Sequence, residues 1–132
     1  MKGIKLEDPR NVDCVELEKP VPGPGEALIR IVTAGICGSD IGAFRGTNTL
    51  VSYPRIIGHE LAGIVEEIPA DNPKGLKPGD KVIVDPYIYC GECYPCSIGR
   101  TNCCTSLKVL GVHIDGGMAE YFCHPADMLV KM

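Results

Sequence analysis

The sequence is notable first for what it lacks. It has no Trp and only two Phe, and no apolar run approaches the roughly 18 residues of a membrane-spanning helix, so we expect no membrane partner. Its 13 Lys and Arg stand against 17 Asp and Glu, a net charge of −4 that argues against a nucleic-acid partner. No apolar leader follows Met1, so we expect a cytoplasmic protein.

Another missing feature is the G-x-G-x-x-G pattern of dinucleotide-binding folds, so residues 1–132 show no nucleotide fingerprint. What the chain does contain is 16 Gly and 11 Pro, which divide it into short segments. This punctuation is typical of an antiparallel barrel or sandwich and not of long helices. The sequence therefore predicts a mainly β domain over residues 1–132.

Individual elements follow from local patterns. Ser39 or Asp40 is expected to cap a single helical turn at residues 39–46. Gly63 lies inside an expected strand and indicates a bulge or a close backbone approach. The expected strands cover residues 3–8, 12–20, 26–38, 58–68, 81–86, 116–125 and 127–132.

Eight cysteines are present, and five of them lie in the stretch CGECYPCSIGRTNCC, residues 90–104. Cys90, Cys93 and Cys96 follow C-x-x-C spacing, and Cys103 and Cys104 come after them. Four thiolates bind zinc tetrahedrally in closed sites whose task is folding. We therefore predict a structural zinc site in a lobe of about residues 87–108. Spacing alone leaves open whether Cys103 or Cys104 is the fourth ligand.

Other uses of these thiols fit less well. Disulfides belong to an oxidising compartment, for which the sequence shows no secretory signal. A redox C-x-x-C pair needs only two thiols, whereas three are linked here. An iron–sulfur cluster takes four cysteines too, but no redox-partner sequence accompanies them.

A second candidate site combines Cys37 in GICGSD with His59 in GHELAG. One thiolate and one imidazole are half of a catalytic zinc site, which keeps a position for substrate. Asp40 is placed to hold the other ring nitrogen, Ser39 to pass a proton, and Glu60 to serve as a reserve ligand.

The alternative for this pair is a buried structural thiol and a core histidine. The metalloprotease pattern H-E-x-x-H is excluded, because position 63 is Gly.

Four stretches of the chain together resemble the zinc-dependent medium-chain alcohol and polyol dehydrogenases, and they occur in the order found in that family. The four stretches are GICGSD, YPRIIGHELAGIV, LKPGDKVIV and CGECYPCSIGRTNCC. CGSD is more similar to the sorbitol, threonine and sugar-acid branch than to the ethanol branch. The stretch NCCTSLKVLGVHIDGGMAEY also resembles this branch, and within it the enzymes that act on sugar acids.

The resemblance implies a GroES-like domain, a partly open β-barrel with short helices and a protruding zinc-binding loop. It implies that a Rossmann domain for NAD(P) belongs to the parent enzyme but lies outside residues 1–132. The implied reaction is oxidation of a secondary alcohol of a small alcohol or polyol to a ketone, in a parent homodimer or homotetramer. The fragment alone is expected to be inactive, and a non-catalytic zinc-binding module is the alternative.

Residue roles also follow from the resemblance. Cys37 and His59 would bind the catalytic zinc, with Glu60 as an alternate ligand, Ser39 as proton relay and Asp40 orienting the histidine. Cys90, Cys93, Cys96 and Cys104 would bind the lobe zinc, leaving Cys103 spare. The resemblance matches no motif to Cys14 or Cys123, which we expect to be packed thiols.

The sequence departs from the family pattern at two points. Many family members carry a relay histidine where this chain has Gly42, so the relay would run through water, through another group such as His113, or differently. We expect His113 to be a loop residue and His124 to be structural. The third catalytic zinc ligand of the family would lie beyond Met132.

Overall fold

The computed structural model describes residues 1–132. It begins with a hairpin of β1 (Lys2–Asp8) and β2 (Asn11–Glu16), which turns at Pro9 and Arg10 between the two strands expected at residues 3–8 and 12–20. The other elements are β3 (Glu26–Gly35), α1 (Gly38–Arg45), β4 (Arg55–Ile56), β5 (Glu60–Glu67), β6 (Lys81–Val84), β7 (Tyr87–Ile88), α2 (Tyr94–Ser97), the 3-10 turn η1 (Thr101–Cys103), β8 (Lys108–Val109), β9 (Tyr121–Pro125), the 3-10 turn η2 (Ala126–Met128) and β10 (Leu129–Lys131).

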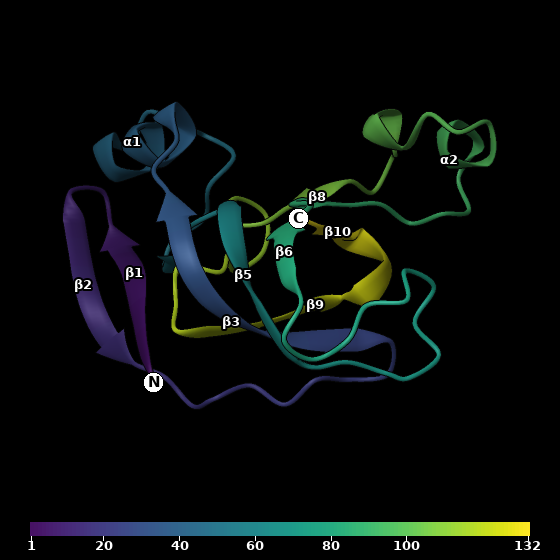
Figure 1. Cartoon of the computed structure of the whole chain (residues 1–132). Helices are drawn as coiled ribbons and strands as arrows, with labels where there is room; N and C mark the ends of the chain where they lie inside the picture. Colours follow the sequence, from purple (N-terminus) through teal and green to yellow (C-terminus); the bar gives the residue numbers. More distant parts are fainter.

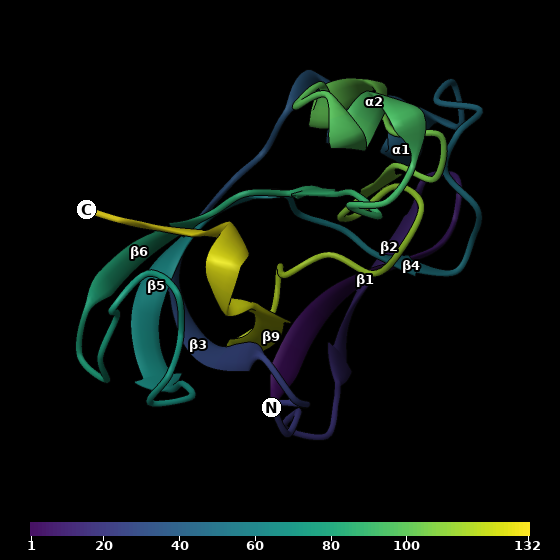
Figure 2. The same cartoon turned by 90° about the vertical axis from the view of Figure 1, so that its right-hand side faces the viewer.

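These strands form three sheets, and every pairing between named strands is antiparallel. The largest sheet has the order β10-β6-β5-β3-β9, the second has the order β2-β1-β4, and β7 pairs with β8. Figure 2 shows η2 inside the curve of the large sheet and the β1–β2 hairpin on the other side. The prediction of a mainly β fold with short helices is confirmed.

The main core fills the curve of the large sheet. Side chains alternate along the strands, so that every second residue of β5, such as Leu61 and Val65, points inward. Each fully buried Leu, Ile or Val contributes about 1.5–3 kcal/mol relative to an exposed one. The nine core residues are Ala27, Ile29, Leu61, Val65, Leu76, Val82, Val84, Leu110 and Leu129.

Gly63 is a point of close backbone approach, as the sequence predicts. A Cβ on this residue would collide with the carbonyl oxygen of Arg30 and would lie 2.6 Å from Ile29 Cγ2. The pairing of β3 with β5 shifts register just beyond, between Ile31 and Thr33. Only glycine lets the two strands approach this closely.

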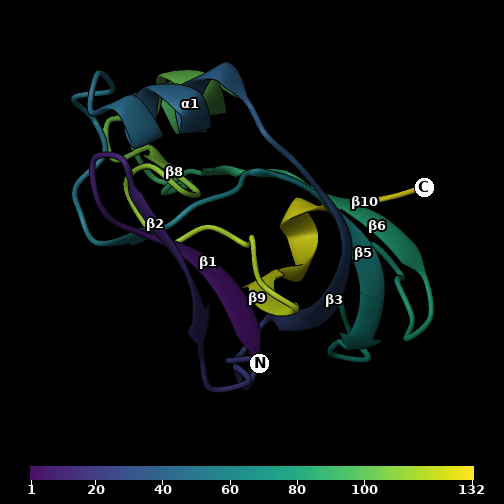
Figure 3. The same cartoon turned by 90° about the vertical axis from the view of Figure 1, so that its left-hand side faces the viewer.

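Helix α1 lies at one end of the strands, and the cysteine-rich lobe with α2 protrudes at the same end (Figures 1 and 3). A second core of Leu6, Ala43, Val51, Ile57 and Val112 packs beneath α1. The helix differs from its prediction at its start, because Cys37 is the N-cap residue and Asp40 occupies the third helical position. None of the helices is long and apolar enough to cross a membrane.

The strand expected at residues 116–125 begins only at Tyr121. Residues 116–119 leave the large sheet and form hydrogen bonds elsewhere, whereas Glu120 O still accepts from Ile31 N–H in β3. Met118 N–H, for example, donates to Ile57 O at 3.0 Å. This segment therefore supports the part of the chain that comes just before His59.

Candidate functional site

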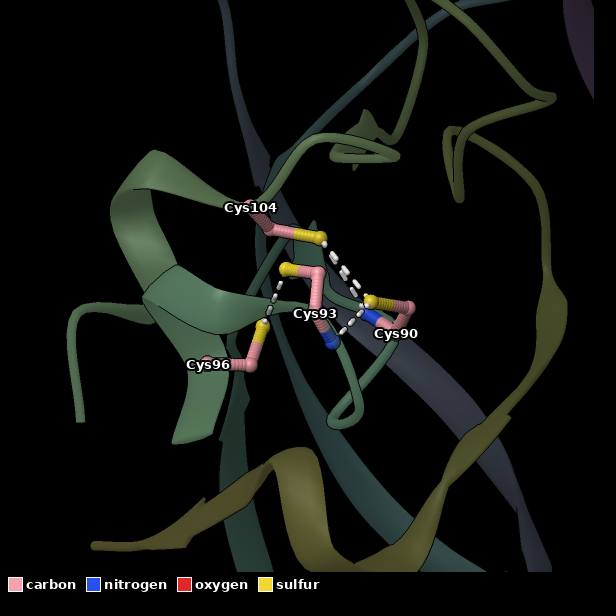
Figure 4. A group of neighbouring side chains, drawn as sticks. All are labelled: Cys90, Cys93, Cys96 and Cys104. Atoms are coloured by element: carbon pink, nitrogen blue, oxygen red, sulfur yellow. Dashed lines mark hydrogen bonds between the residues drawn. The ribbon is translucent and has the colours of Figure 1, made fainter. Parts of the chain in front are cut away.

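The four-cysteine cluster occupies the protruding lobe. Cys90 follows β7, Cys93 caps α2, Cys96 lies within α2 and Cys104 follows η1. Their sulfur atoms point toward one another (Figure 4) and all lie within 4.8 Å. Four thiols gathered around one point are the arrangement that a single bound metal ion requires.

The sulfur geometry fits zinc. Cys93 Sγ lies 3.4 Å from Cys96 Sγ, and Cys104 Sγ lies 3.5 Å from Cys90 Sγ. Sulfurs arranged tetrahedrally at about 2.3 Å from a zinc ion would be about 3.8 Å apart. Each of these two pairs would therefore have to separate only slightly to bind one ion, and the whole cluster lies within 4.8 Å.

Backbone N–H groups also prepare the cluster for thiolates. The N–H groups of Cys90 and Ser106 both donate to Cys104 Sγ at 3.3 Å, and Cys93 N–H donates to Cys90 Sγ at 3.4 Å. Backbone hydrogen bonds, chiefly that involving Cys90, lower the pKa of the Cys104 thiol. A sulfur that accepts such bonds is stabilised as the anion that metal binding needs.

Cys93 and Cys96 respond oppositely to this environment. Backbone hydrogen bonds from Thr105 and then Cys96 lower the pKa of Cys93 to about 6. Desolvation, followed by the neighbouring Cys93, raises the pKa of Cys96 to about 12. Cys96 thus keeps its proton at neutral pH unless a cation compensates the charge of its thiolate, which is the condition that a bound divalent metal supplies.

A second cluster joins Cys37, His59 and Glu60, whose sulfur, nitrogen and oxygen ligand atoms lie within 4.8 Å of one another. Cys37 follows the end of β3, and His59 and Glu60 stand at the start of β5. The pairing of Gly35 with Glu60 aligns the two strand ends, and a Cβ on Gly35 would overlap the Glu60 carboxylate. A mixed sulfur, nitrogen and oxygen donor set suits zinc.

Asp40 links the two halves of this cluster. Its Oδ2 accepts a hydrogen bond from Cys37 N–H at 2.8 Å, and its Oδ1 lies 3.6 Å from His59 Nδ1. The Asp40 side chain is buried, and His59 Nδ1 is buried without a hydrogen-bond partner. A carboxylate in this place would orient the imidazole once the other ring nitrogen is bound to a metal.

Ser39 contacts the other nitrogen of the imidazole. Its Oγ lies 3.4 Å from His59 Nε2, at the first turn of α1. The sequence-predicted residues Cys37, Ser39, His59 and Glu60 are thus brought together, and Asp40 faces the Nδ1 side of the ring.

A cleft of about 520 Å³ opens beside this cluster. Sequence reasoning missed the lining residues that are not ligands, including the polar Thr33 and Tyr87. Two sequence features could have pointed to these residues. Tyr87 lies three residues before Cys90, and Thr33 is the one polar residue between Arg30 and Gly35. Neither feature is specific to a binding site. The lining consists of Thr33, Cys37, His59, Glu60, Leu61, Ala62, Ile83, Val84, Pro86 and Tyr87.

Two other histidines lie outside this cleft. His113 is exposed, and its Nδ1 accepts a hydrogen bond from Val109 N–H at 3.1 Å, as expected of a loop residue. His124 is fully buried in β9 and donates from Nε2 to Asp85 O at 2.8 Å, a structural role as predicted. Gly42 stands where many family members carry the relay histidine. A Cβ added to this residue would lie 3.6 Å from Thr47 Oγ1.

The remaining cysteines do not join either cluster. Cys103 is exposed although its neighbour Cys104 is buried. Cys14 is exposed on β2, so the expectation of a packed thiol does not hold there. Cys123 is half-buried, and desolvation raises the pKa of its thiol to about 11.

Comparison with known proteins decides the family. The family model described as the alcohol dehydrogenase GroES-like domain matches residues 23–132. The chain belongs to this family. The predicted resemblance, including its sugar-acid and threonine dehydrogenase branch, is thereby confirmed.

Relatives of this GroES-like domain match it over all or nearly all of its length. An uncharacterized zinc-type alcohol dehydrogenase-like protein of Haemophilus influenzae is 58% identical over 132 residues, which are 100% of this chain and 39% of the relative. The L-galactonate-5-dehydrogenase of Escherichia coli K12 is 44% identical over 125 residues, 95% of this chain and 36% of that enzyme.

A solved alcohol dehydrogenase from Escherichia coli CFT073, complexed with NADH, superposes with a TM-score of 0.90 at 45% identity. The match covers 100% of this chain and 38% of that one. The chain therefore spans about two fifths of the length of these relatives.

Proposed function

We propose that the chain is the catalytic domain of a zinc-dependent dehydrogenase that oxidises a secondary alcohol to a ketone with NAD(P)+. The observation that carries this proposal is the convergence of Cys37, His59 and Glu60 at the side of an open cleft. Membership of the alcohol dehydrogenase GroES-like family supports it.

Two metal sites would have different tasks. Cys90, Cys93, Cys96 and Cys104 would hold a structural zinc, because four thiolates leave no position for a substrate. Cys37 and His59 would hold the catalytic zinc, with Glu60 as a third or exchangeable ligand. When bound there, the ion would act as a Lewis acid that lowers the pKa of a substrate hydroxyl.

The surrounding side chains handle the proton and the geometry. Ser39 Oγ, close to His59 Nε2, would take the proton of the substrate hydroxyl and pass it outward. Asp40 would keep the imidazole oriented and stabilise the turn that carries Cys37. The apolar walls of the cleft, among them Leu61 and Ile83, would exclude water from the reacting carbon.

Hydride transfer requires an acceptor, which we do not assign to residues 1–132. The reaction converts the alcohol and NAD(P)+ into the ketone, NAD(P)H and one proton. We place the cofactor on a Rossmann domain of the parent protein, supported by the NADH complex of the solved relative. The parent would be a homodimer or homotetramer.

The cleft lining also bears on the substrate class. Thr33 and Tyr87 offer hydroxyl groups, Glu60 is acidic, and none of the ten lining residues is Lys or Arg. A polyol would find hydrogen-bond partners here, whereas the carboxylate of a sugar acid would find no cation on this wall. We therefore favour a neutral polyol, with a sugar acid as the second candidate because of the L-galactonate-5-dehydrogenase relative.

The test is oxidation by the zinc-loaded parent protein, followed through formation of NADH or NADPH with neutral polyols and with the matching sugar acids. The Ser39→Ala variant should lower kcat by roughly 10² to 10⁴, whereas Ser39→Thr should retain much of the activity. Ser97→Ala, which removes an exposed hydroxyl of the lobe, is the matched control.

Absence of oxidation with every alcohol and both cofactors would overturn the proposal in favour of a non-catalytic zinc-binding module. A preference for sugar acids would overturn only the choice of the neutral polyol.

A further inference from the structure

The stretch VHIDGGMAEY, residues 112–121, contributes no residue to the metal cluster or to the cleft lining. Instead, its central residues bond to the chain that leads into His59. Gly116 N–H donates to Ile56 O at 2.8 Å, and Gly117 N–H donates to Gly58 O at 3.0 Å. With the Met118 bond to Ile57, three consecutive carbonyl groups before His59 are each held by this stretch.

The side chain of Asp115 also bonds to the segment before His59. Its Oδ1 accepts hydrogen bonds from Ile56 N–H at 3.1 Å and from Arg55 Nη1 at 3.0 Å. Arg55 is also tied to Ser52 Oγ at 2.8 Å, and its side chain is mostly buried. One carboxylate thus fixes both a backbone N–H and the cationic side chain of this segment.

Glycines make the close approach of the two segments feasible. A Cβ on Gly116 would collide with the carbonyl oxygen of Gly58. Gly58 itself has φ 100°, and a Cβ there would lie 2.8 Å from Met118 Cβ. Residues other than glycine are strained at a positive φ. Glycine at position 58 therefore permits both the backbone turn that leads into His59 and the close packing against Met118.

The supporting stretch is itself anchored. Ile4 N–H donates to Met118 O at 2.8 Å, and Gly3 forms a bridge to Ala119. Strand β4 (Arg55–Ile56) already pairs with β1, and the stretch 116–119 adds a second connection between the segment before His59 and β1.

His59 depends on this backbone support because its ring has weak contacts of its own. Its Nδ1 has no hydrogen bond and lies 3.6 Å from Asp40 Oδ1, and Nε2 has only the long 3.4 Å contact with Ser39. The position of the imidazole relative to Cys37 is therefore set mainly by where the backbone places residue 59.

We propose that Asp115 is a positioning residue for His59, acting through Ile56 and Arg55 and without contact with the substrate. The inference rests on the proposed function, since it assigns the stretch 115–118 to the support of the metal centre. It also gives VHIDGGMAEY a role in supporting a metal ligand, whereas the resemblance used the longer stretch NCCTSLKVLGVHIDGGMAEY only as a sign of the sugar-acid branch.

The experiment compares Asp115→Ala, Asp115→Asn and Asp80→Ala in the protein loaded with Co²⁺, whose absorption distinguishes a four-thiolate site from a mixed site. Asp80 is the matched control, because it also accepts a backbone N–H, from Lys77 at 2.9 Å, and pairs with one cation, Lys131 at 2.8 Å. Asp115→Asn keeps an oxygen acceptor for Ile56. The second readout is the NMR signal of the His59 imidazole, with and without metal.

Asp115→Ala should weaken Co²⁺ binding at the mixed site about tenfold, the lower end for residues that support metal ligands. It should also shift or broaden the His59 signals and leave the four-thiolate spectrum unchanged. Asp115→Asn should restore most of both properties, and Asp80→Ala should alter neither.

The proposal is overturned if Asp115→Ala leaves the His59 signals and the mixed-site affinity unchanged, or if Asp80→Ala changes them equally. A wild-type protein without any mixed-site metal would count against the proposed function, and the His59 signals in the metal-free protein would still decide the role of Asp115.

Discussion

The sulfur of Cys104 lies 3.5 Å from that of Cys90, fourteen residues earlier in the chain. Cys103, the residue next to it, is exposed and takes no part in the cluster. The 3-10 turn η1 ends between the two, so that adjacent residues face different surroundings. This relationship selects one of two thiols that the spacing of the sequence could not separate.

Exchanging each thiol for a hydroxyl tests this selection. Cys104→Ser should lose the lobe zinc and unfold the lobe, because such a site supplies on the order of 10 kcal/mol of apparent folding free energy. Cys103→Ser should keep the zinc. Metal analysis of the two purified proteins is the measurement, and equal zinc in both would show that either thiol can complete the site.

His124 predicts a pH dependence of stability. Burial lowers the pKa of this histidine, and the hydrogen bond to Asp85 counters that effect only in part. In the unfolded chain, the histidine has a pKa of about 6.5. As the pH falls through this value, His124 binds a proton in the unfolded chain but stays neutral in the folded chain. The contribution of His124 to stability is therefore fully present above about pH 6.5 and is lost below it, with a slope of at most about 1.4 kcal/mol per pH unit.

Urea unfolding at a series of pH values measures this slope for the wild type and for His124→Gln, whose side-chain amide can still donate to Asp85 O. The variant should lose the part of the slope between about pH 5 and 6.5, above the range where carboxylates titrate. An identical slope in both proteins would remove His124 as its source.

Gly63 predicts a steric effect on stability. In Gly63→Ala, the new methyl group would meet the Arg30 carbonyl and Ile29, both fixed within the large sheet. Overpacking of this kind typically costs about 1–3 kcal/mol.

Gly38→Ala is the control for this substitution, because nothing lies within 4 Å of its added Cβ at the start of α1. Its unfolding free energy should stay within about 1 kcal/mol of the wild type. The measurement is chemical denaturation of both variants, and a Gly63→Ala protein as stable as the wild type would contradict the close approach of β3 and β5.

Much of this fold is encoded locally. The hairpin at residues 2–16 follows from its turn residues, and β3 and β5 follow from runs of branched residues. The close approach at Gly63 could be predicted because a glycine inside a strand often marks a bulge or a near backbone. The helix start is encoded less clearly, because Cys37 is a poor cap by residue type and becomes the N-cap with the help of the Asp40 carboxylate.

Local sequence patterns do not predict how the residues of the candidate site come together. The sequence could assign Cys37 and His59 to one metal only with the support of a family resemblance, because the pairing of β3 with β5 is what brings them together. The contact of Asp115 with Arg55 joins residues that lie 60 positions apart. Such contacts depend on tertiary packing, which periodicity and spacing do not describe.

The presence of two metal centres is the feature on which the proposed function depends most directly. Zinc per chain should be measured on the purified wild type, on His59→Ala and on Cys93→Ser. We predict two zinc ions in the wild type, loss of the cleft zinc alone in His59→Ala, and loss of the lobe zinc in Cys93→Ser. A wild-type protein with a single zinc that His59→Ala leaves in place would contradict the catalytic metal centre of Cys37, His59 and Glu60.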